Sequence, residues 1–292
     1  MKVLCFGSLN IDYVYSMDHI VQPGETENSS NRSINPGGKG LNQSIALARA
    51  GLTVWLAGMV GAEGKDLIDK CNQNGVNADL VRVTDGPSGH TIIQVDKDGN
   101  NSIILYGGAN QCMTSDYIDQ VLKAFDSGDM LILQNEINKL DEIIDKAYTR
   151  GMTIVLNPSP YNQALDKCDL TKISYFFINE IEGYQMTCCK EPDQILKTIH
   201  SKYPLANVIL TLGEDGAMYY DGQTIYRQEA YKVKAVDTTA AGDTFTGYFV
   251  SSLVNAMAPQ EGLVLAAKAS AIAVTKPGAL DSIPVLEEVI KI

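Results

Sequence analysis

Residues 130–157 read MLILQNEINKLDEIIDKAYTRGMTIVLN, and the fold prediction starts from this stretch. Met130–Leu133 and Thr153–Leu156 are short, almost continuous apolar runs, which are typical of strands buried on both faces. Leu140–Arg150, between them, is predicted to be a helix. A strand, a helix and a second strand in this order predict a right-handed crossover between parallel strands.

The same alternation extends over most of the chain. Further strands are predicted at Lys2–Gly7, Thr53–Val60, Tyr175–Ile178 and Val208–Leu212, and a hairpin at Asp221-Gly222. Further helices are predicted at Leu41–Ala50, Lys65–Asn74, Ser115–Phe125, Glu180–Met186, Asp193–Tyr203, Gly242–Ala256 and Pro259–Thr275. We therefore expect an α/β fold whose central, mostly parallel sheet is covered by helices on both faces.

Two early segments, near residues 11–35 and 91–106, break this alternation. Each reads as a pair of half-exposed strands, and the second pair flanks Asp98-Gly99, a dipeptide suited to a tight turn. They predict a small antiparallel appendage that acts as a lid or an oligomer contact. Because no linker or repeat divides the chain, we expect residues 1–292 to form a single domain that carries this lid.

Composition excludes several classes of protein. Among 292 residues, 23 Lys and Arg face 35 Asp and Glu, so the net charge of −12 disfavours nucleic-acid binding. No apolar run could span a bilayer, and Asp12 interrupts any signal peptide, so a cytoplasmic, soluble protein without membrane contact is expected. Six cysteines without a C-x-x-C pair predict reduced thiols. Three dispersed histidines disfavour a histidine metal site and a Ser-His-Asp hydrolase.

Two glycine-rich stretches, each immediately before a helix, carry the chemical signal. They are Pro36–Asn42, which reads PGGKGLN, and Asp237–Gly247, which reads DTTAAGDTFTG. Unpaired amides at a helix start attract anions, and glycine lets a ligand approach the backbone closely. Asp243 stands beside the second anion site, where a carboxylate is expected only if it acts on the bound group as a general base. Neither a Walker loop nor a dinucleotide G-x-G-x-x-G pattern is present.

Asn10 and Asp12 lie two residues apart just beyond the first strand, hence on one side of an extended chain. An amide and a carboxylate are natural partners for vicinal hydroxyl groups. Both residue types also cap turns, so this pair alone is weak evidence.

Taken together, these motifs resemble those of the ribokinase-like, or phosphofructokinase-B, family of sugar kinases. Gly37–Ser44 with Gly51 is similar to the first family signature and Asp237–Gly247 to the second, and the likeness runs through nearly the whole chain. Within the family the motifs are most similar to those of ribose kinases. The resemblance implies ATP-dependent phosphorylation of the exocyclic hydroxymethyl of a pentose, with D-ribose and ribose 5-phosphate as the first expectation. A sister kinase for another sugar or a nucleoside, and a non-catalytic sugar- or nucleotide-binding regulator, stay as alternatives.

The resemblance also implies roles for individual residues. Asp243 would be the catalytic base, and the amides of Ala241, Gly242 and Asp243 would hold the developing negative charge. The residues implied for sugar binding are Asn10, Asp12, Gly38, Lys39, Asn42 and Glu136. Those implied for ATP are Thr211, Gly213, Gly216 and Gly242, with Asn179 and Glu182 helping to place Mg²⁺ and phosphates.

A monovalent-cation site, with K⁺ as an activator, is implied as well. Its oxygen ligands would come from Asp237, Thr239, Ala273, Lys276, Gly278 and Ser282, largely through backbone carbonyls. Sugar preference, adenine contacts and oligomeric state stay open, with a homodimer through the lid as one alternative.

Overall fold

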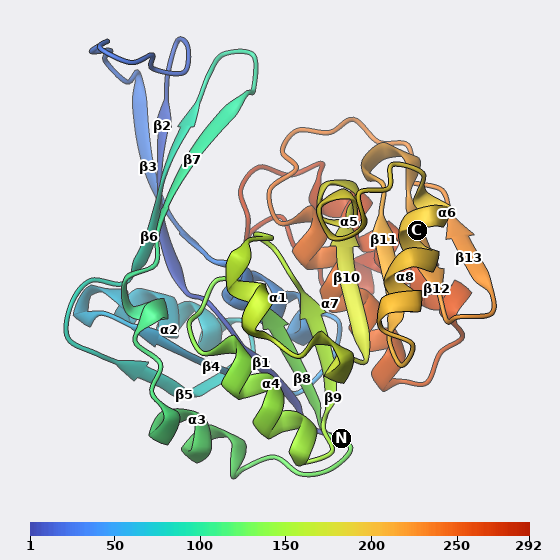
Figure 1. The fold of residues 1–292 in the computed structure, drawn as a ribbon. Helices are drawn as coiled ribbons and strands as arrows, with labels where there is room; N and C mark the ends of the chain where they lie inside the picture. The colour runs from blue at the N-terminus through green and yellow to red at the C-terminus, as the bar shows by residue number, and fades with distance from the viewer.

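The computed structural model describes residues 1–292 and has a nine-stranded central sheet (Figure 1). Its strands, in spatial order, are β13 (Ile225–Gln228), β12 (Ala217–Tyr220), β11 (Asn207–Thr211), β10 (Tyr175–Asn179), β9 (Thr153–Asn157), β8 (Met130–Gln134), β1 (Val3–Phe6), β4 (Val54–Val60) and β5 (Val76–Val83). The strands from β11 to β5 are parallel, and β12 and β13 add an antiparallel hairpin at one edge. The prediction of a mostly parallel sheet is confirmed.

Helices cover both faces of this sheet. The α-helices are α1 (Lys39–Arg49), α2 (Lys65–Gln73), α3 (Ser115–Leu122), α4 (Leu140–Thr149), α5 (Glu180–Thr187), α6 (Pro192–Lys202), α7 (Ala241–Val254), α8 (Pro259–Ala273) and α9 (Leu286–Val289). Short 3-10 helices lie at Ala62–Gly64, Gly108–Gln111, Gln163–Lys167, Leu170–Lys172 and Gly213–Asp215.

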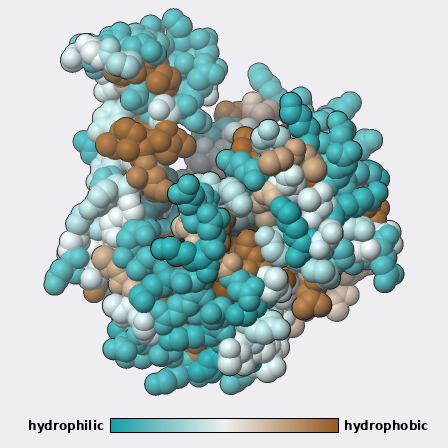
Figure 2. Space-filling model, in the orientation of Figure 1, coloured by the Kyte–Doolittle hydropathy of each residue, from teal (hydrophilic) through white to brown (hydrophobic).

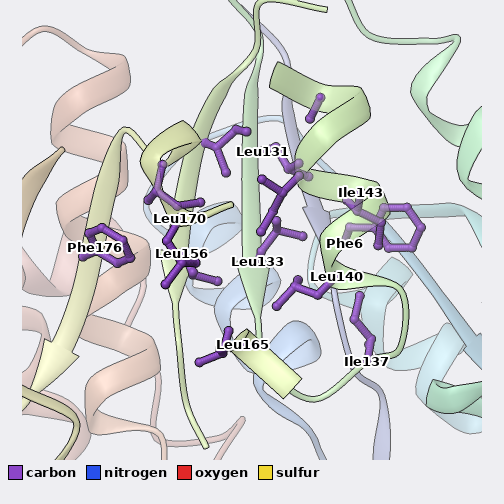
Figure 3. Packing of buried hydrophobic residues seen from close by; sticks show 14 of the residues in the cluster. Phe6, Leu131, Leu133, Ile137, Leu140, Ile143, Leu156, Leu165, Leu170 and Phe176 are labelled. Carbon is purple, nitrogen blue, oxygen red and sulfur yellow. The ribbon is translucent and has the colours of Figure 1, made fainter. Parts of the chain in front are cut away.

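The strands alternate between two separate hydrophobic cores. In β8, Leu131 and Leu133 point into a core closed by α3, α4, α5 and α6, part of which Figure 3 shows. Met130 and Ile132, on the opposite face, join the core closed by α1, α2, α7 and α8. This alternation explains why the strand is apolar from Met130 to Leu133: both of its faces are buried.

The two early segments form one small sheet of strands β3 (Asn31–Gly37), β2 (Asn10–Ser16), β6 (Gly89–Val95) and β7 (Asn101–Tyr106), in that order. It projects from the main body, at the upper left of Figure 1. The predicted antiparallel pairing is found within each hairpin, β2 with β3 and β6 with β7. The two hairpins meet through a parallel pairing of β2 with β6, because both strands leave the main body in the same direction.

The sequence prediction misses one strand of the central sheet, β5. This strand lies at the edge and is only partly buried, and the prediction overlooked its alternation of apolar Val76, Ala78 and Leu80 with polar Asn77 and Asp79. No helix of the chain has both the length and the hydropathy needed to cross a bilayer.

The parallel topology fixes where a site can form. The carboxyl ends of β1, β8, β9, β10 and β11 lie on the same side of the sheet, and α1, α5 and α7 begin there. In open α/β sheets, ligands bind in the crevice at the carboxyl ends of the strands.

Candidate active site

A cavity of about 250 Å³ opens at the carboxyl ends of these strands. Its walls come from the starts of α1, α5 and α7 and from the ends of β9, β10 and β11. The lining residues are Lys39, Asn157, Ser159, Phe177, Ile178, Asn179, Glu182, Thr211, Thr238, Ala240, Gly242, Asp243 and Thr246. Only three of these thirteen residues are hydrophobic, so the cavity suits a polar ligand.

The start of α7 presents open backbone amides to this cavity. Ala240 precedes the helix in the left-handed conformation, with φ of 59°, and turns the chain into the first helical turn. The amide of Ala241 donates to the Thr238 carbonyl at 3.2 Å, whereas the amides of Gly242 and Asp243 have no acceptor within the protein. Two of the three predicted amides are therefore free to bind an anion.

Asp243 lies in the first turn of α7 and is 8% exposed. Two side-chain amides of α1 hold its carboxylate: Asn42 Nδ2 donates to Oδ2 at 3.0 Å, and Gln43 Nε2 donates to Oδ1 at 2.9 Å. Each carboxylate oxygen therefore has one fixed N–H donor. The carboxylate is thus fixed in orientation at the cavity wall.

Lys39 and Glu136 meet at the start of α1. The Lys39 amide donates to Glu136 Oε2 at 3.2 Å, and the Ser8 hydroxyl donates to the same oxygen. Burial acts against the charged ammonium of Lys39, but the surrounding carboxylates, chiefly those of Asp243 and Glu136, outweigh burial and raise its pKa. Burial also raises the pKa of Glu136, against the opposing effect of Lys39. The sugar-side residues thus form one charged cluster with Asp243.

Asn10 and Asp12 are the first and third residues of β2, next to the start of α1. Asn10 Oδ1 accepts from Asn110 Nδ2 at 2.7 Å, and Asp12 Oδ1 accepts from the Thr91 hydroxyl at 2.6 Å. Burial raises the pKa of the Asp12 carboxyl above its ordinary value, and the Thr91 hydrogen bond only partly offsets this.

Gly37 and Gly38 connect this pair to the α1 start. A Cβ on Gly37 would overlap the Asp12 carboxylate. One on Gly38, whose φ is 96°, would lie 2.9 Å from the backbone nitrogen of Asn10. The predicted sugar residues therefore adjoin one another, but of the six only Lys39 lines the cavity itself.

On the nucleotide side, Asn179 and Glu182 form the capping box of α5. Asn179 Oδ1 accepts from the backbone N–H of Glu182 at 2.9 Å, and the backbone N–H of Asn179 donates to Glu182 Oε2 at 3.0 Å. The Asn-x-x-Glu pattern thus has a structural role, and both side chains also line the cavity. Thr211 lines it too, whereas Gly213 and Gly216 lie in the following turn and do not.

The residues predicted for the monovalent cation are brought together in part. Asp237 Oδ1 accepts from Thr239, and Oδ2 accepts from the Gly278 amide at 2.9 Å, so one carboxylate links the loop before α7 to the loop after α8. The Ala273 carbonyl accepts from the Lys276 amide in the same turn, whereas the Ser282 hydroxyl bonds to Ala279. No group of three or more His, Cys, Asp or Glu side chains is gathered as a metal cluster.

Sequence reasoning missed the amides that support Asp243. Gln43 belongs to the quoted first motif but received no role, and Asn157 and Gln134 lie at strand ends without any motif. A polar residue that ends an otherwise apolar parallel strand is the one signal that could have found the latter two.

Comparison with known proteins shows the family of this chain. The family model for pfkB family carbohydrate kinases matches residues 1–286. A ribokinase of Staphylococcus aureus is 33% identical over 302 aligned residues, which cover 99% of this chain and 98% of that protein.

Two solved structures give the same picture. A Cryptococcus neoformans ribokinase in complex with ADP has a TM-score of 0.88 and 32% identity and covers 99% of both chains. An Arabidopsis thaliana ribokinase complexed with ribose and ATP has a TM-score of 0.86 and 28% identity and covers 99% of this chain and 97% of that one. From its matching family model, its full-length similarity and the arrangement of its cavity, this chain belongs to the pfkB family of carbohydrate kinases.

Proposed function

We propose that this protein transfers the γ-phosphoryl group of ATP to the exocyclic hydroxymethyl of D-ribose, giving ribose 5-phosphate. The observation that carries the proposal is the Asp243 carboxylate, held by two amides beside the open amides of Gly242 and Asp243. The similarity to proteins named ribokinase, one of them solved with ribose and ATP, supports ribose as the acceptor.

In the proposed reaction, Asp243 accepts the proton of the attacking hydroxyl group as its oxygen bonds to the γ-phosphorus. The open amides at the start of α7 stabilise the negative charge that develops on the transferred group. ADP leaves with the electrons of the broken phosphorus–oxygen bond. Lys39, whose ammonium faces Asp243 and Glu136, contributes positive charge in an otherwise acidic protein.

The sugar is proposed to lie between β2 and the start of α1. Asn10, Asp12 and Glu136 would accept or donate hydrogen bonds with its ring hydroxyls, together with Lys39 and Asn42. Asn42 Oδ1 is buried and has no donor within the protein, which leaves one acceptor on the same amide group that holds Asp243.

Mg²⁺ fits the nucleotide side of the cavity. Glu182 uses Oε2 in the capping box, and no protein donor contacts Oε1, so one carboxylate oxygen is left. Mg²⁺ is commonly held by one or two carboxylates together with substrate phosphates, and it neutralises phosphate charge during transfer. We assign Glu182, with Asn179 as its orienting partner, to this task.

K⁺ fits the loops on either side of Asp237. Hard cations take oxygen ligands, and Asp237, Thr239 and Gly278 already meet in one hydrogen-bonded cluster. A bound cation would hold the loop that leads into α7, and thereby the open amides. Residues Ala273, Lys276 and Ser282 complete the proposed ligand set.

A second copy of the chain is the proposed partner of the small sheet. Ile34, Ile103, Ile104 and Tyr106 are each more than half exposed, and Figure 2 shows apolar side chains gathered on this projecting part. Exposed apolar residues on the two edge strands, β3 and β7, favour association. Sedimentation at increasing protein concentration would reveal a monomer if this is wrong.

A substrate panel tests the function. Turnover of ATP is measured with ribose, 2-deoxyribose, fructose and a nucleoside, each with Mg²⁺ and with or without K⁺. We expect the highest kcat/KM with ribose, a phosphate ester on the exocyclic carbon by NMR, and faster turnover with K⁺. Indifference to ribose together with turnover of another alcohol would reject the acceptor while leaving the kinase assignment in place.

A further inference from the structure

Gln43 is the most completely bonded side chain around Asp243. It is fully buried, at 0% exposure. Its Nε2 donates to Asp243 Oδ1 at 2.9 Å and to Asn157 Oδ1 at 3.3 Å, and its Oε1 accepts from Gln134 Nε2 at 2.6 Å. These contacts join α1 to the ends of β8 and β9 and to the start of α7.

The orientation of each amide in this chain follows from its neighbour. Because Asp243 Oδ1 is the acceptor, Gln43 turns its NH₂ group toward it and its carbonyl oxygen toward Gln134. Gln134 must then present its own NH₂ group to that oxygen. Asn157 fixes the second hydrogen of Gln43, because its own Nδ2 donates to the Phe177 carbonyl at 2.8 Å and its Oδ1 is left to accept.

This arrangement leaves one polar atom unsatisfied. Gln134 Oε1 is buried and has no donor within the protein, and it sits against Gly7, where a Cβ would overlap it. A buried acceptor without a partner costs stability, and an apolar residue of similar size would avoid that cost. Core packing alone therefore does not explain a glutamine at position 134.

We propose that Gln43 and Gln134 are positioning residues for the catalytic base: Gln134 orients the Gln43 amide, and Gln43 holds the Asp243 carboxylate toward the acceptor hydroxyl. This inference rests on the proposed function, in which Asp243 takes the hydroxyl proton. Neither glutamine lines the cavity, so both act only through Asp243.

Steady-state kinetics of the full chain test the proposal with Gln43→Met, Gln134→Met, the double variant and Gln73→Met, an exposed control on α2. We expect kcat to fall about 10–100-fold for Gln43→Met and several-fold for Gln134→Met, with KM for sugar and ATP within about threefold, because misplacing a reacting group costs rate rather than binding. The double variant should be no slower than Gln43→Met, since Gln134 acts through Gln43. Gln73→Met should match the wild type.

Thermal melting separates positioning from structural support. Gln134→Met removes the unsatisfied Gln134 oxygen but leaves the buried Gln43 Oε1 without its donor, so we expect these two effects on stability to offset and the Tm to stay close to that of the wild type while kcat falls. A lower Tm with unchanged kcat would overturn the proposal, and this variant decides the matter if Gln43→Met fails to fold.

The Asp243→Asn background distinguishes this inference from the proposed function. If Gln43 acts through Asp243, adding Gln43→Met to Asp243→Asn should not reduce the residual rate further. Full activity of Asp243→Asn would overturn the proposed base itself. Loss of activity in Asp243→Asn with wild-type kcat in Gln43→Met would overturn only the positioning role.

Discussion

The starts of α1 and α7 are both rich in glycine and both face the cavity, but different surroundings require the glycines. At α1, a Cβ on Gly40 would lie 2.5 Å from the carbonyl carbon of Gly7, and one on Gly37 would overlap Asp12. At α7, a Cβ on Gly242 would have no heavy atom within 4 Å. The α1 glycines let the protein pack on itself, whereas Gly242 keeps open a space that a ligand can enter.

The same contrast extends to the side chains. The α1 start supplies neutral amides, Asn42 and Gln43, that hold a group belonging to the other helix. The α7 start supplies that group, Asp243, and the open amides beside it. The start of α1 thus holds the carboxylate in place, and the start of α7 carries it.

The largest expected effect comes from Asp243→Asn. Loss of the proton acceptor should lower kcat about 10²–10⁴-fold, with little change in sugar affinity. Initial rates give kcat, and calorimetric titration gives the sugar Kd. Because Asp98→Asn alters an exposed carboxylate in the β6–β7 turn, it serves as the matched control and should retain full activity. Comparable turnover in the two variants would end the distinction between the helix starts.

Gly40→Ala should break the packing at α1. Its methyl group would meet backbone atoms of Gly7 and Ser8, which cannot move aside as a flexible side chain can. We expect a loss of about 3 kcal/mol in the free energy of unfolding, measured by urea titration. An unchanged urea midpoint would mean that the α1 glycines are not needed for close packing.

Gly242→Ala is the matched substitution at α7 and should behave in the opposite way. The added methyl group has free space in the protein, so stability should stay the same or rise by up to about 1 kcal/mol from better helix propensity. Because the methyl group enters the space proposed for phosphate, kcat/KM for ATP should fall roughly 10-fold. If this variant melts early and keeps its kinetics, the proposed phosphate position is wrong.

Asp12→Asn should give the smallest effect, and one that depends on pH. Because burial raises the pKa of this carboxyl above its ordinary 3.8, the folded state binds the proton more tightly than the unfolded state. The wild type therefore loses stability as the pH rises through the folded-state pKa, whereas the Asn variant does not. At pH 7 the Asn variant should have a higher Tm than the wild type, and this difference in Tm should become smaller as the pH falls toward 3.8.

Sugar binding by the same variant completes this test. A neutral amide accepts a weaker hydrogen bond than a carboxylate, so the sugar Kd should rise about 10-fold. An unchanged Kd would remove Asp12 from the proposed sugar site, and a constant Tm gap between pH 7 and 4.5 would contradict the role of burial.

The sequence predicted the central sheet well because strands buried on both faces are almost continuously apolar, as β8 is from Met130 to Leu133. It failed at β5, where an edge position relaxes that requirement, and it did not predict the parallel pairing of β2 with β6. The pairing of distant hairpins leaves little trace in local periodicity, whereas the alternation in β5 was present in the sequence and was overlooked.

For the site, local motifs revealed the residues that lie on helix starts but not their supports. Asp243, Asn42 and Lys39 fall within recognisable stretches, whereas Gln134 is 91 residues from the Gln43 that it contacts. A single polar residue at the end of an apolar strand is indistinguishable from a solvated strand terminus until its neighbours are known.

What the sequence by itself determined is the class of the fold, the two glycine-rich helix starts and the carboxylate at the second of them, since these depend on period and on residues close together in the chain. The tertiary structure alone decided which amides hold that carboxylate and which glycine faces open space. The physical reason is that hydrogen-bond partners and empty volume are set by elements far apart in sequence, which only the assembled sheet and its helices bring together.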